Sequence, residues 1–173
     1  MQPNEKNRCH LSKQFYIMKK MFVFSLVSVL FFGCIKSSNS TPACTDVTPA
    51  EEATTIRGFC IQKGIDYTVD SSGIYYQVID PGIAPKPMPS SVITTTYVGE
   101  FLSGNVLDSN LHGYTNNLNQ LIPAWQIGLQ KIGKGGHIKM VAPSSLCYGC
   151  NGYPPRVPAN SILYFDIYLV DVQ

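Results

Sequence analysis

Cys147 and Cys150 form a CxxC pair, the one motif in the chain whose residue types and spacing could carry redox chemistry. Such a pair at the start of a helix has a lowered thiol pKa and exchanges with disulfides. The residues that follow here, Asn151 to Pro158, contain three prolines and predict a loop rather than a helix. A structural disulfide or two plain thiols are therefore favoured for this pair. An enzyme that exchanges thiols and disulfides is a weaker hypothesis than the two given at the end of this section.

Histidine and glycine patterns typical of other kinds of catalysis are incomplete. His112 lies in a predicted loop without a carboxylate or cysteine at ligand spacing, and His137 is expected on the solvent side of a strand. A zinc site and a Ser-His-Asp triad therefore have little support. The segment from Gly133 to Gly136 lacks the phosphate-binding pattern and predicts a turn. We expect no metal and no cofactor.

Aromatic side chains on apolar faces are the remaining candidates for chemistry. Tyr97, Trp125 and Phe165 each fall on the apolar side of a predicted element. Taken singly, large aromatic residues in such positions usually belong to a hydrophobic core. Their role therefore depends on the elements that position them.

Four segments have the alternating or β-branched composition of strands. Between the second and third of them, residues 122–132 predict a short helix with Pro123 near its start and an apolar stripe that includes Trp125. The strands do not alternate with helices, which favours an antiparallel α+β fold. The predicted strands are residues 73–80, 92–101, 137–142 and 162–171.

A second helix is expected ahead of the strands. Thr48-Pro49-Ala50-Glu51 is a capping box with proline at the first helical position, and Gly64 is a stop signal. The helix is predicted over residues 49–63. The predicted parts of the exported chain are a Ser/Thr-rich tether that begins with Cys34 (34–47), a helical extension (48–65) and the core domain (66–173).

The N-terminus has the features of an export signal. Lys19 and Lys20 precede an apolar run that ends at Gly33 and is too short to span a membrane comfortably. Residues 1–33 are therefore predicted to be a signal peptide, and a mis-assigned start codon best explains residues 1–17. The position of Cys34, after a small residue and before a Ser-rich tether, resembles a bacterial lipoprotein signal in which this cysteine carries the lipid.

Basic residues are concentrated in the predicted signal. Residues 1–33 contain five basic side chains and one acidic one, whereas residues 34–173 contain eight basic and ten acidic ones, a net charge of −2. The exported part therefore lacks the basic surface of a nucleic-acid-binding protein, and we predict no such partner. Acyl chains on Cys34 would anchor the protein to the cell envelope, at the outer membrane facing the periplasm.

Export also places the remaining cysteines in a compartment where disulfides persist. Cys44, Cys60, Cys147 and Cys150 allow three pairings, among which the sequence does not decide. Proximity along the chain favours Cys44–Cys60 together with Cys147–Cys150.

Four sequence blocks, taken together, resemble the FKBP-type peptidyl-prolyl isomerase domain. They are TTYVGEFLSGNVLDS, LIPAWQIGLQKIGKGG, KMVAPSSLCYG and VPANSILYFDIYLVDV, in this order between Ser72 and Val172. The resemblance implies an antiparallel sheet of five or six strands wrapped around a short helix, with an apolar pocket between them and the N-terminal helix as an extension. The Cys34-anchored tether and capped helix are similar to FKBP-like lipoproteins of Bacteroidota.

The same resemblance implies roles for individual residues. Tyr97, Asp108, Trp125 and Tyr148 match the family's catalytic positions, with Trp125 as the pocket floor and the Asp108 carboxylate facing the Tyr97 hydroxyl. The Ile122 backbone N–H and the Tyr148 hydroxyl would orient the substrate carbonyls. The implied substrate-binding residues are Leu107, Leu121, Ile122, Tyr153, Val157 and Phe165.

The resemblance favours a prolyl isomerase that acts on proline-containing polypeptides, assists the folding of exported proteins and accepts macrolide inhibitors in the same pocket. The alternative is a non-catalytic peptide-binding or chaperone module of the same fold. Leu107 stands where the family usually has phenylalanine, and the segment between Asp108 and Leu121 is shorter than usual. The resemblance implies an aromatic side chain from this segment at the pocket, and Tyr114 or His112 would supply it.

Overall fold

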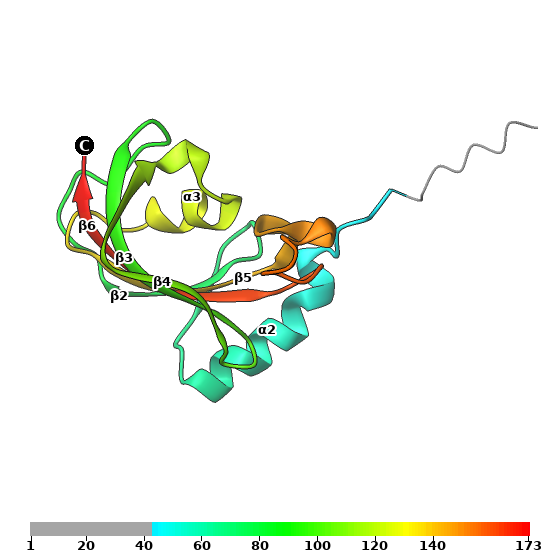
Figure 1. Cartoon of the computed structure of the whole chain (residues 1–173). Helices are drawn as coiled ribbons and strands as arrows, with labels where there is room; N and C mark the ends of the chain where they lie inside the picture. Colours follow the sequence, from blue (N-terminus) through cyan, green and yellow to red (C-terminus); the bar gives the residue numbers. More distant parts are fainter. Residues whose placement is uncertain (1–42) are drawn as a thin grey trace, which may run out of the picture. The chain divides into compact units, whose positions relative to one another are not determined.

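Six antiparallel strands form one sheet in the order β1-β2-β5-β6-β3-β4. The computed structural model describes residues 43–173, and Figure 1 shows the two helices on opposite sides of the sheet. The strands are β1 (Thr68–Val69), β2 (Tyr75–Asp80), β3 (Val92–Phe101), β4 (Val106–Asn117), β5 (His137–Ala142) and β6 (Leu163–Val172). The helices are α2 (Pro49–Lys63) and α3 (Pro123–Leu129), with 3₁₀ turns η2 (Leu118–Gln120), η3 (Ser144–Leu146) and η4 (Gly149–Asn151).

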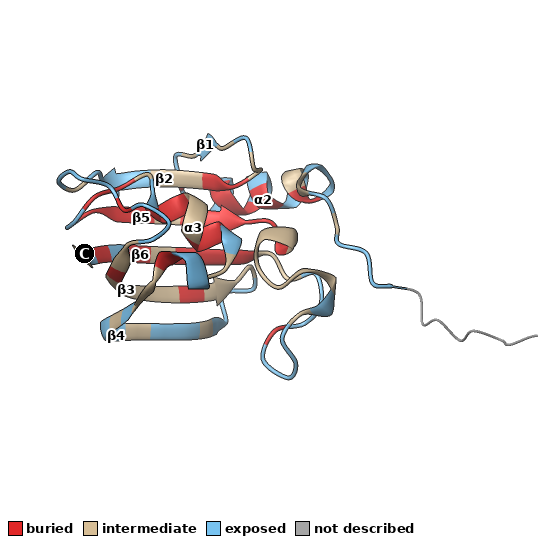
Figure 2. Cartoon of the chain, turned by 90° about the horizontal axis from the view of Figure 1, so that it is seen from above, coloured by how far each residue is buried: buried red, intermediate tan, exposed pale blue. Residues whose placement is uncertain are grey.

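The main core lies between α3 and one face of the sheet. In Figure 2 the central strands and α3 are largely buried, whereas β4, at the edge of the sheet, is largely exposed. The alternation predicted for the last strand is confirmed, because every second residue points into this core. The four inward residues, Leu163, Phe165, Ile167 and Leu169, are buried.

Helix α2 covers the other face of the sheet over part of its length. The predicted capping box is confirmed: the Glu51 N–H donates to the Thr48 side chain, and the Thr48 N–H donates to the Glu51 carboxylate at 2.8 Å. Gly64 ends the helix in the left-handed conformation, as its position predicted. Ile56 and Phe59 on this helix are buried in a second apolar cluster, so the extension and the sheet pack as one unit.

Two strands were absent from the sequence-based prediction. β1 is only two residues long, and β4 takes up most of the segment between Asp108 and Leu121, including His112, for which a loop was predicted. Residues of β4 are mostly exposed, because an edge strand has solvent on one side and no strand beyond it. Its sequence therefore lacks the apolar alternation that marks a half-buried strand. The last strand begins at Leu163 and ends at Val172, one residue later at each end than predicted.

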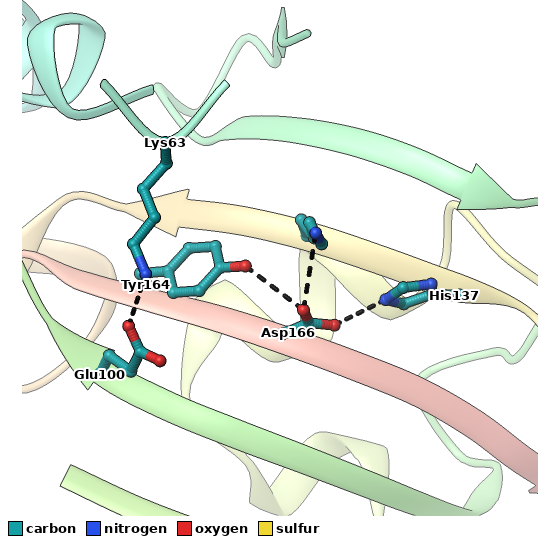
Figure 3. Close-up of polar contacts among 6 residues, drawn as sticks. Lys63, Glu100, His137, Tyr164 and Asp166 are labelled. Atoms are coloured by element: carbon teal, nitrogen blue, oxygen red, sulfur yellow. Dashed lines mark hydrogen bonds and ion pairs between the residues drawn. The ribbon is translucent and has the colours of Figure 1, made fainter. Parts of the chain in front are cut away.

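A polar cluster lies on the same face of the sheet as α2, opposite the main core. The Asp166 carboxylate is 2.6 Å from His137 Nε2 and 3.8 Å from Lys139 Nζ, and it accepts a longer hydrogen bond from the Tyr164 hydroxyl (Figure 3). The expectation that His137 is exposed to solvent is wrong. Its ring stacks on Tyr168 at 3.8 Å and is 8% exposed, because aromatic stacking covers one face of the imidazole.

The cysteine pairing favoured by proximity is also wrong. Cys44 is bonded to Cys150, which lies 106 positions further along the sequence, and their Cα atoms are 5.7 Å apart. Cys60 and Cys147 are free. Cys60 lies in the cluster beneath α2, whereas Cys44 precedes that helix in an extended segment that reaches the loop carrying Cys150. Proximity along the chain failed because the helix separates Cys44 from Cys60.

Asp70, in the turn before β2, forms an ion pair that responds to pH. The Lys131 ammonium group, 2.6 Å away, and the Ser72 N–H lower the pKa of Asp70 to about 2. A carboxyl group with a lowered pKa stabilises the fold above its unfolded pKa of about 3.9, and this contribution is lost as the pH falls toward 2.

We therefore expect D70N to lower the free energy of unfolding by about 1–2 kcal/mol at pH 7, since the pair is only about one-fifth exposed. Denaturant titrations at pH 7, 4 and 2 measure this difference between the wild type and the variant. The difference should shrink below pH 4, and a constant difference down to pH 2 would contradict the assigned role. D171N, which removes the partner of the more exposed Lys134, is the matched control.

The sequence also predicts a signal peptide over residues 1–33 and a lipid on Cys34. The predicted signal peptide and Cys34 lie outside the described residues. Within residues 43–173, no helix is both long and apolar enough to cross a membrane.

Candidate active site

A pocket of about 260 Å³ opens between α3, the β3–β4 side of the sheet and the loop that precedes β6. Pockets for drug-sized ligands are about 300–1,000 Å³, so this one suits a smaller group such as one or two amino-acid residues. Its lining is mainly aromatic and aliphatic, with a few polar groups. The lining residues are Tyr97, Gly99, Leu107, Asp108, Tyr114, Gln120, Leu121, Ile122, Trp125, Tyr148, Tyr153, Arg156, Val157 and Phe165.

Trp125 lies at the centre of the aromatic lining. Its ring centroid is 4.8 Å from that of Tyr97 and 5.8 Å from that of Phe165, and both pairs are nearly perpendicular. Edge-to-face pairs at these distances are favourable because of the ring quadrupoles. Trp125 is only 5% exposed, so it serves the core and the pocket at once. Pro123 at the start of α3 fixes where the helix begins and hence where Trp125 projects.

Asp108 and Tyr97 bring a polar pair to the pocket wall. β3 and β4 are antiparallel neighbours, and the Tyr97 hydroxyl donates to Asp108 Oδ2 at 2.7 Å. Burial and the Asp108 carboxylate raise the pKa of Tyr97 well above its usual value. Tyr97 therefore stays protonated, and remains a donor, throughout the neutral range.

Gly99 makes room for the pocket beneath this pair. It lies opposite Asp108 on β4 and opposite Phe165 on β6. A Cβ atom at this position would lie 3.2 Å from the Phe165 ring, closer than ordinary van der Waals contact. Glycine here allows the Phe165 ring to lie against the strand and still face the pocket.

The loop between β5 and β6 forms the remaining wall. The rings of Tyr148 and Tyr153 stack with centroids 5.9 Å apart, and Tyr153 and Val157 form an antiparallel bridge. Burial is the main cause of a raised pKa at Tyr148, whose hydroxyl therefore remains a donor. The buried Glu52 of α2 accepts hydrogen bonds from the Ser144 N–H and hydroxyl, which fixes the start of the loop.

The N-terminal segment holds the same loop from outside. Cys44 is bonded to Cys150, two residues after Tyr148, and the Cys150 N–H donates to the Asp46 carboxylate at 2.7 Å. Burial and the Glu52 carboxylate raise the pKa of the Cys147 thiol. A reactive thiol has a lowered pKa, so this environment disfavours the thiol–disulfide hypothesis.

Comparison with known proteins identifies the fold. Residues 84–170 match the family model described as FKBP-type peptidyl-prolyl cis-trans isomerase. The chain belongs to this family. The crystal structure of FkpA from Escherichia coli is similar to this FKBP-type chain with a TM-score of 0.62 and 25% identity, over 100% of this chain and 84% of that one.

Two further comparisons agree with the assignment to the FKBP-type family. The Escherichia coli K12 protein "FKBP-type peptidyl-prolyl cis-trans isomerase FkpA" is 37% identical over 121 residues, which are 66% of this chain and 43% of that protein. The crystal structure of a peptidyl-prolyl cis-trans isomerase from Pseudomonas syringae has a TM-score of 0.62 and 25% identity, and the match covers 75% of this chain and 98% of that one. This chain thus spans less than half the length of the curated FkpA relative.

The structure brings together all ten residues that the sequence predicted for the site of this FKBP-type domain. Four of them match the family's catalytic positions and six its substrate-binding positions. All ten line the same pocket. Their individual roles stay predictions. Of the two candidates for the aromatic partner in the shortened segment, Tyr114 lines the pocket, with its ring 5.9 Å from that of Tyr97. His112 is exposed and does not.

Sequence reasoning missed three lining residues: Gly99, Gln120 and Arg156. Gly99 lies inside the block TTYVGEFLSGNVLDS, and its place two residues after Tyr97 was a usable signal. Arg156 is the one basic residue in the proline-rich loop from Asn151 to Pro158, and its charge beside the predicted site residues Tyr153 and Val157 was a usable signal.

Within residues 43–173, no three His, Cys, Asp or Glu side chains are grouped so as to hold a metal ion. The described groups instead form a largely apolar site with one carboxylate, one guanidinium group and several neutral donors. Such a site can bind a small apolar ring and an attached amide.

Proposed function

We propose that this protein is a peptidyl-prolyl cis-trans isomerase that assists the folding of exported proteins. The observation that carries the proposal is the Tyr97–Asp108 hydrogen bond beside Trp125, in a pocket large enough for one or two residues. Membership of the FKBP-type family supports the same reaction. The substrates would be proline-containing polypeptides.

The chemistry requires no covalent change. Rotation about a peptide bond has a barrier of about 18–20 kcal/mol, and uncatalysed X–Pro isomerisation takes tens to hundreds of seconds. In the transition state the amide is twisted and has lost its resonance, so its C–N bond is less polar than in the planar form. An apolar pocket that excludes water therefore binds the twisted amide more strongly than the planar one. A 10⁴-fold acceleration needs about 5.4 kcal/mol of such preference.

The ten predicted site residues have proposed parts in that preference. Trp125 and Phe165 would contact the proline ring, with Leu107, Leu121 and Val157 completing the apolar wall. The Ile122 N–H and the Tyr148 hydroxyl would orient the substrate carbonyls. Both groups lack a hydrogen-bond acceptor within residues 43–173, which supports this assignment.

Asp108 would act on the reacting amide. Its Oδ2 accepts from Tyr97, while Oδ1 has no hydrogen bond within the described residues, and the Asp108 side chain as a whole is about half exposed. A carboxylate oxygen in this position favours a partial positive charge nearby and repels a partial negative one. We propose that it aligns the twisted amide with its carbonyl oxygen turned away from Asp108. Tyr153 would border the substrate from the loop that precedes β6.

The test is a protease-free isomerisation assay of the full chain on a Leu-Pro peptide. A rate proportional to enzyme concentration is expected. An unchanged rate at micromolar enzyme, with peptide binding in a parallel titration, would instead support the alternative of a non-catalytic binding or chaperone module. Competition between a macrolide and the peptide is expected as well, since we propose that both occupy this pocket.

We further propose that the protein is exported and lipid-anchored through Cys34 to the cell envelope, at the outer membrane facing the periplasm. The basic segment, the short apolar run and the Gly33-Cys34 pair support this proposal. Incorporation of labelled fatty acid into the wild type but not into C34A is the expected result. Equal labelling of both would remove the support for lipidation.

A further inference from the structure

Arg156 is the one basic side chain among the fourteen residues that line the pocket. It lies in the loop between η4 and β6, and its side chain is 58% exposed at the pocket mouth. None of the proposed steps of isomerisation uses this residue. Its charge and position call for a separate explanation.

The loop backbone holds Arg156 in a fixed place. The N–H groups of Arg156 and Val157 both donate to the Tyr153 carbonyl at 2.9 Å, and the Tyr153 N–H donates to the Val157 carbonyl at 2.8 Å. Val157 is 2% exposed, and Tyr153 stacks on Tyr148. The loop therefore presents the Arg156 side chain to the mouth of the pocket from a closed and anchored turn.

The nearest charge to Arg156 is Asp108, and the two are loosely paired. Arg156 Nη2 lies 3.7 Å from Asp108 Oδ1, which is beyond hydrogen-bond distance, whereas the bridges of Lys131 and Lys134 measure 2.6 and 2.7 Å. The strong hydrogen bond of Asp108 goes to Tyr97. The guanidinium group, with five donors, thus has no hydrogen-bond partner within the described residues.

A substrate carboxylate fits this arrangement. The planar guanidinium group of arginine can donate two parallel hydrogen bonds to one carboxylate. Asp108 accepts neither of them here. Two other carboxylates contact the loop between β5 and β6, and both are already bound: Asp46 to the Cys150 N–H, and Glu52 to the Ser144 N–H and hydroxyl. A carboxylate arriving with the substrate therefore meets one open cation, next to an Asp108 whose charge the Tyr97 hydroxyl partly offsets.

We propose that Arg156 selects polypeptides with an aspartate or glutamate next to the proline. This inference rests on the proposed isomerase function and names its substrate class. Arg156 acts on selectivity rather than on the bond rotation itself. Because the site is exposed and Asp108 competes for the guanidinium, the preference for glutamate over glutamine is about two- to fivefold.

The test uses matched peptides that differ only in glutamate, glutamine or lysine, placed before the proline in one set and after it in the other. The wild type is expected to show a two- to fivefold higher kcat/KM for glutamate than for glutamine in one of the two sets. R156Q should reduce this ratio to about one or below, and R156E should favour lysine. Salt at 1 M should also bring the wild-type ratio toward one, since screening weakens an exposed ion pair.

The control is K86Q, which removes an exposed lysine outside the pocket and should keep the wild-type ratio. Equal ratios in the wild type and R156Q would overturn the proposal. Failure of the isomerase function is a separate result, because it shows as no catalysis of a Leu-Pro peptide by any variant. In that case calorimetric titration with the same glutamate and glutamine peptides still decides whether Arg156 sets the preference.

Discussion

Replacing Asp108 with alanine is expected to lower kcat/KM for a Leu-Pro peptide by about tenfold while leaving the fold intact. The variant removes the carboxylate that accepts from Tyr97 at 2.7 Å and leaves the Tyr97 hydroxyl without its acceptor. A hydrogen bond to a charged group contributes about 1.5–3 kcal/mol, and the half-exposed position of Asp108 reduces this toward the lower limit. About 1.4 kcal/mol corresponds to a factor of ten in rate.

A double-mutant cycle separates this role from a general loss of pocket structure. If Tyr97 and Asp108 act through their shared hydrogen bond, Y97F and D108A each lose activity, and the double variant loses little more than D108A alone. D171A, which removes an exposed carboxylate of a surface ion pair, should keep wild-type kcat/KM. Wild-type kcat/KM in D108A, measured in the same assay, would exclude a catalytic part for this carboxylate.

The elements whose side chains alternate or carry caps could be predicted from the sequence. β6 has apolar residues at every second position from Leu163 to Leu169, and all four are buried. The capping box at Thr48 satisfies the first N–H groups of α2 locally, so the start of the helix needs no tertiary information. The residues that line the pocket could be inferred because the four sequence blocks preserve their order and spacing.

Features fixed by contacts distant in sequence could not be predicted. β4 is a strand because β3 supplies hydrogen bonds along one side, and its exposed residues leave no periodic signal. His137 is buried by Tyr168 on the neighbouring strand, a partner 31 positions away that periodicity within one strand does not reveal. The Cys44–Cys150 pair depends on how the segment before α2 runs across the finished domain.

That disulfide is the basis of the second large prediction. It closes a loop of about 100 residues, for which the chain-entropy account gives about 4.7 kcal/mol and measured native disulfides give about 2–5 kcal/mol. We therefore expect C44S/C150S to lower the free energy of unfolding by about 3–5 kcal/mol and Tm by about 10 °C or more. Denaturant and thermal unfolding under oxidising conditions measure the loss.

Reducing agent supplies the matched control for that measurement. It should lower the stability of the wild type to that of C44S/C150S and leave the double variant unchanged, because Cys60 and Cys147 form no bond to break. A non-reduced digest should contain the peptide of Cys44 linked to that of Cys150. Linkage of Cys147 to Cys150 would contradict the assignment, because the N-terminal segment would then be detached from the loop that carries Tyr148. The stability lost on reduction would in that case be small, because a Cys147–Cys150 disulfide closes a ring of only four residues.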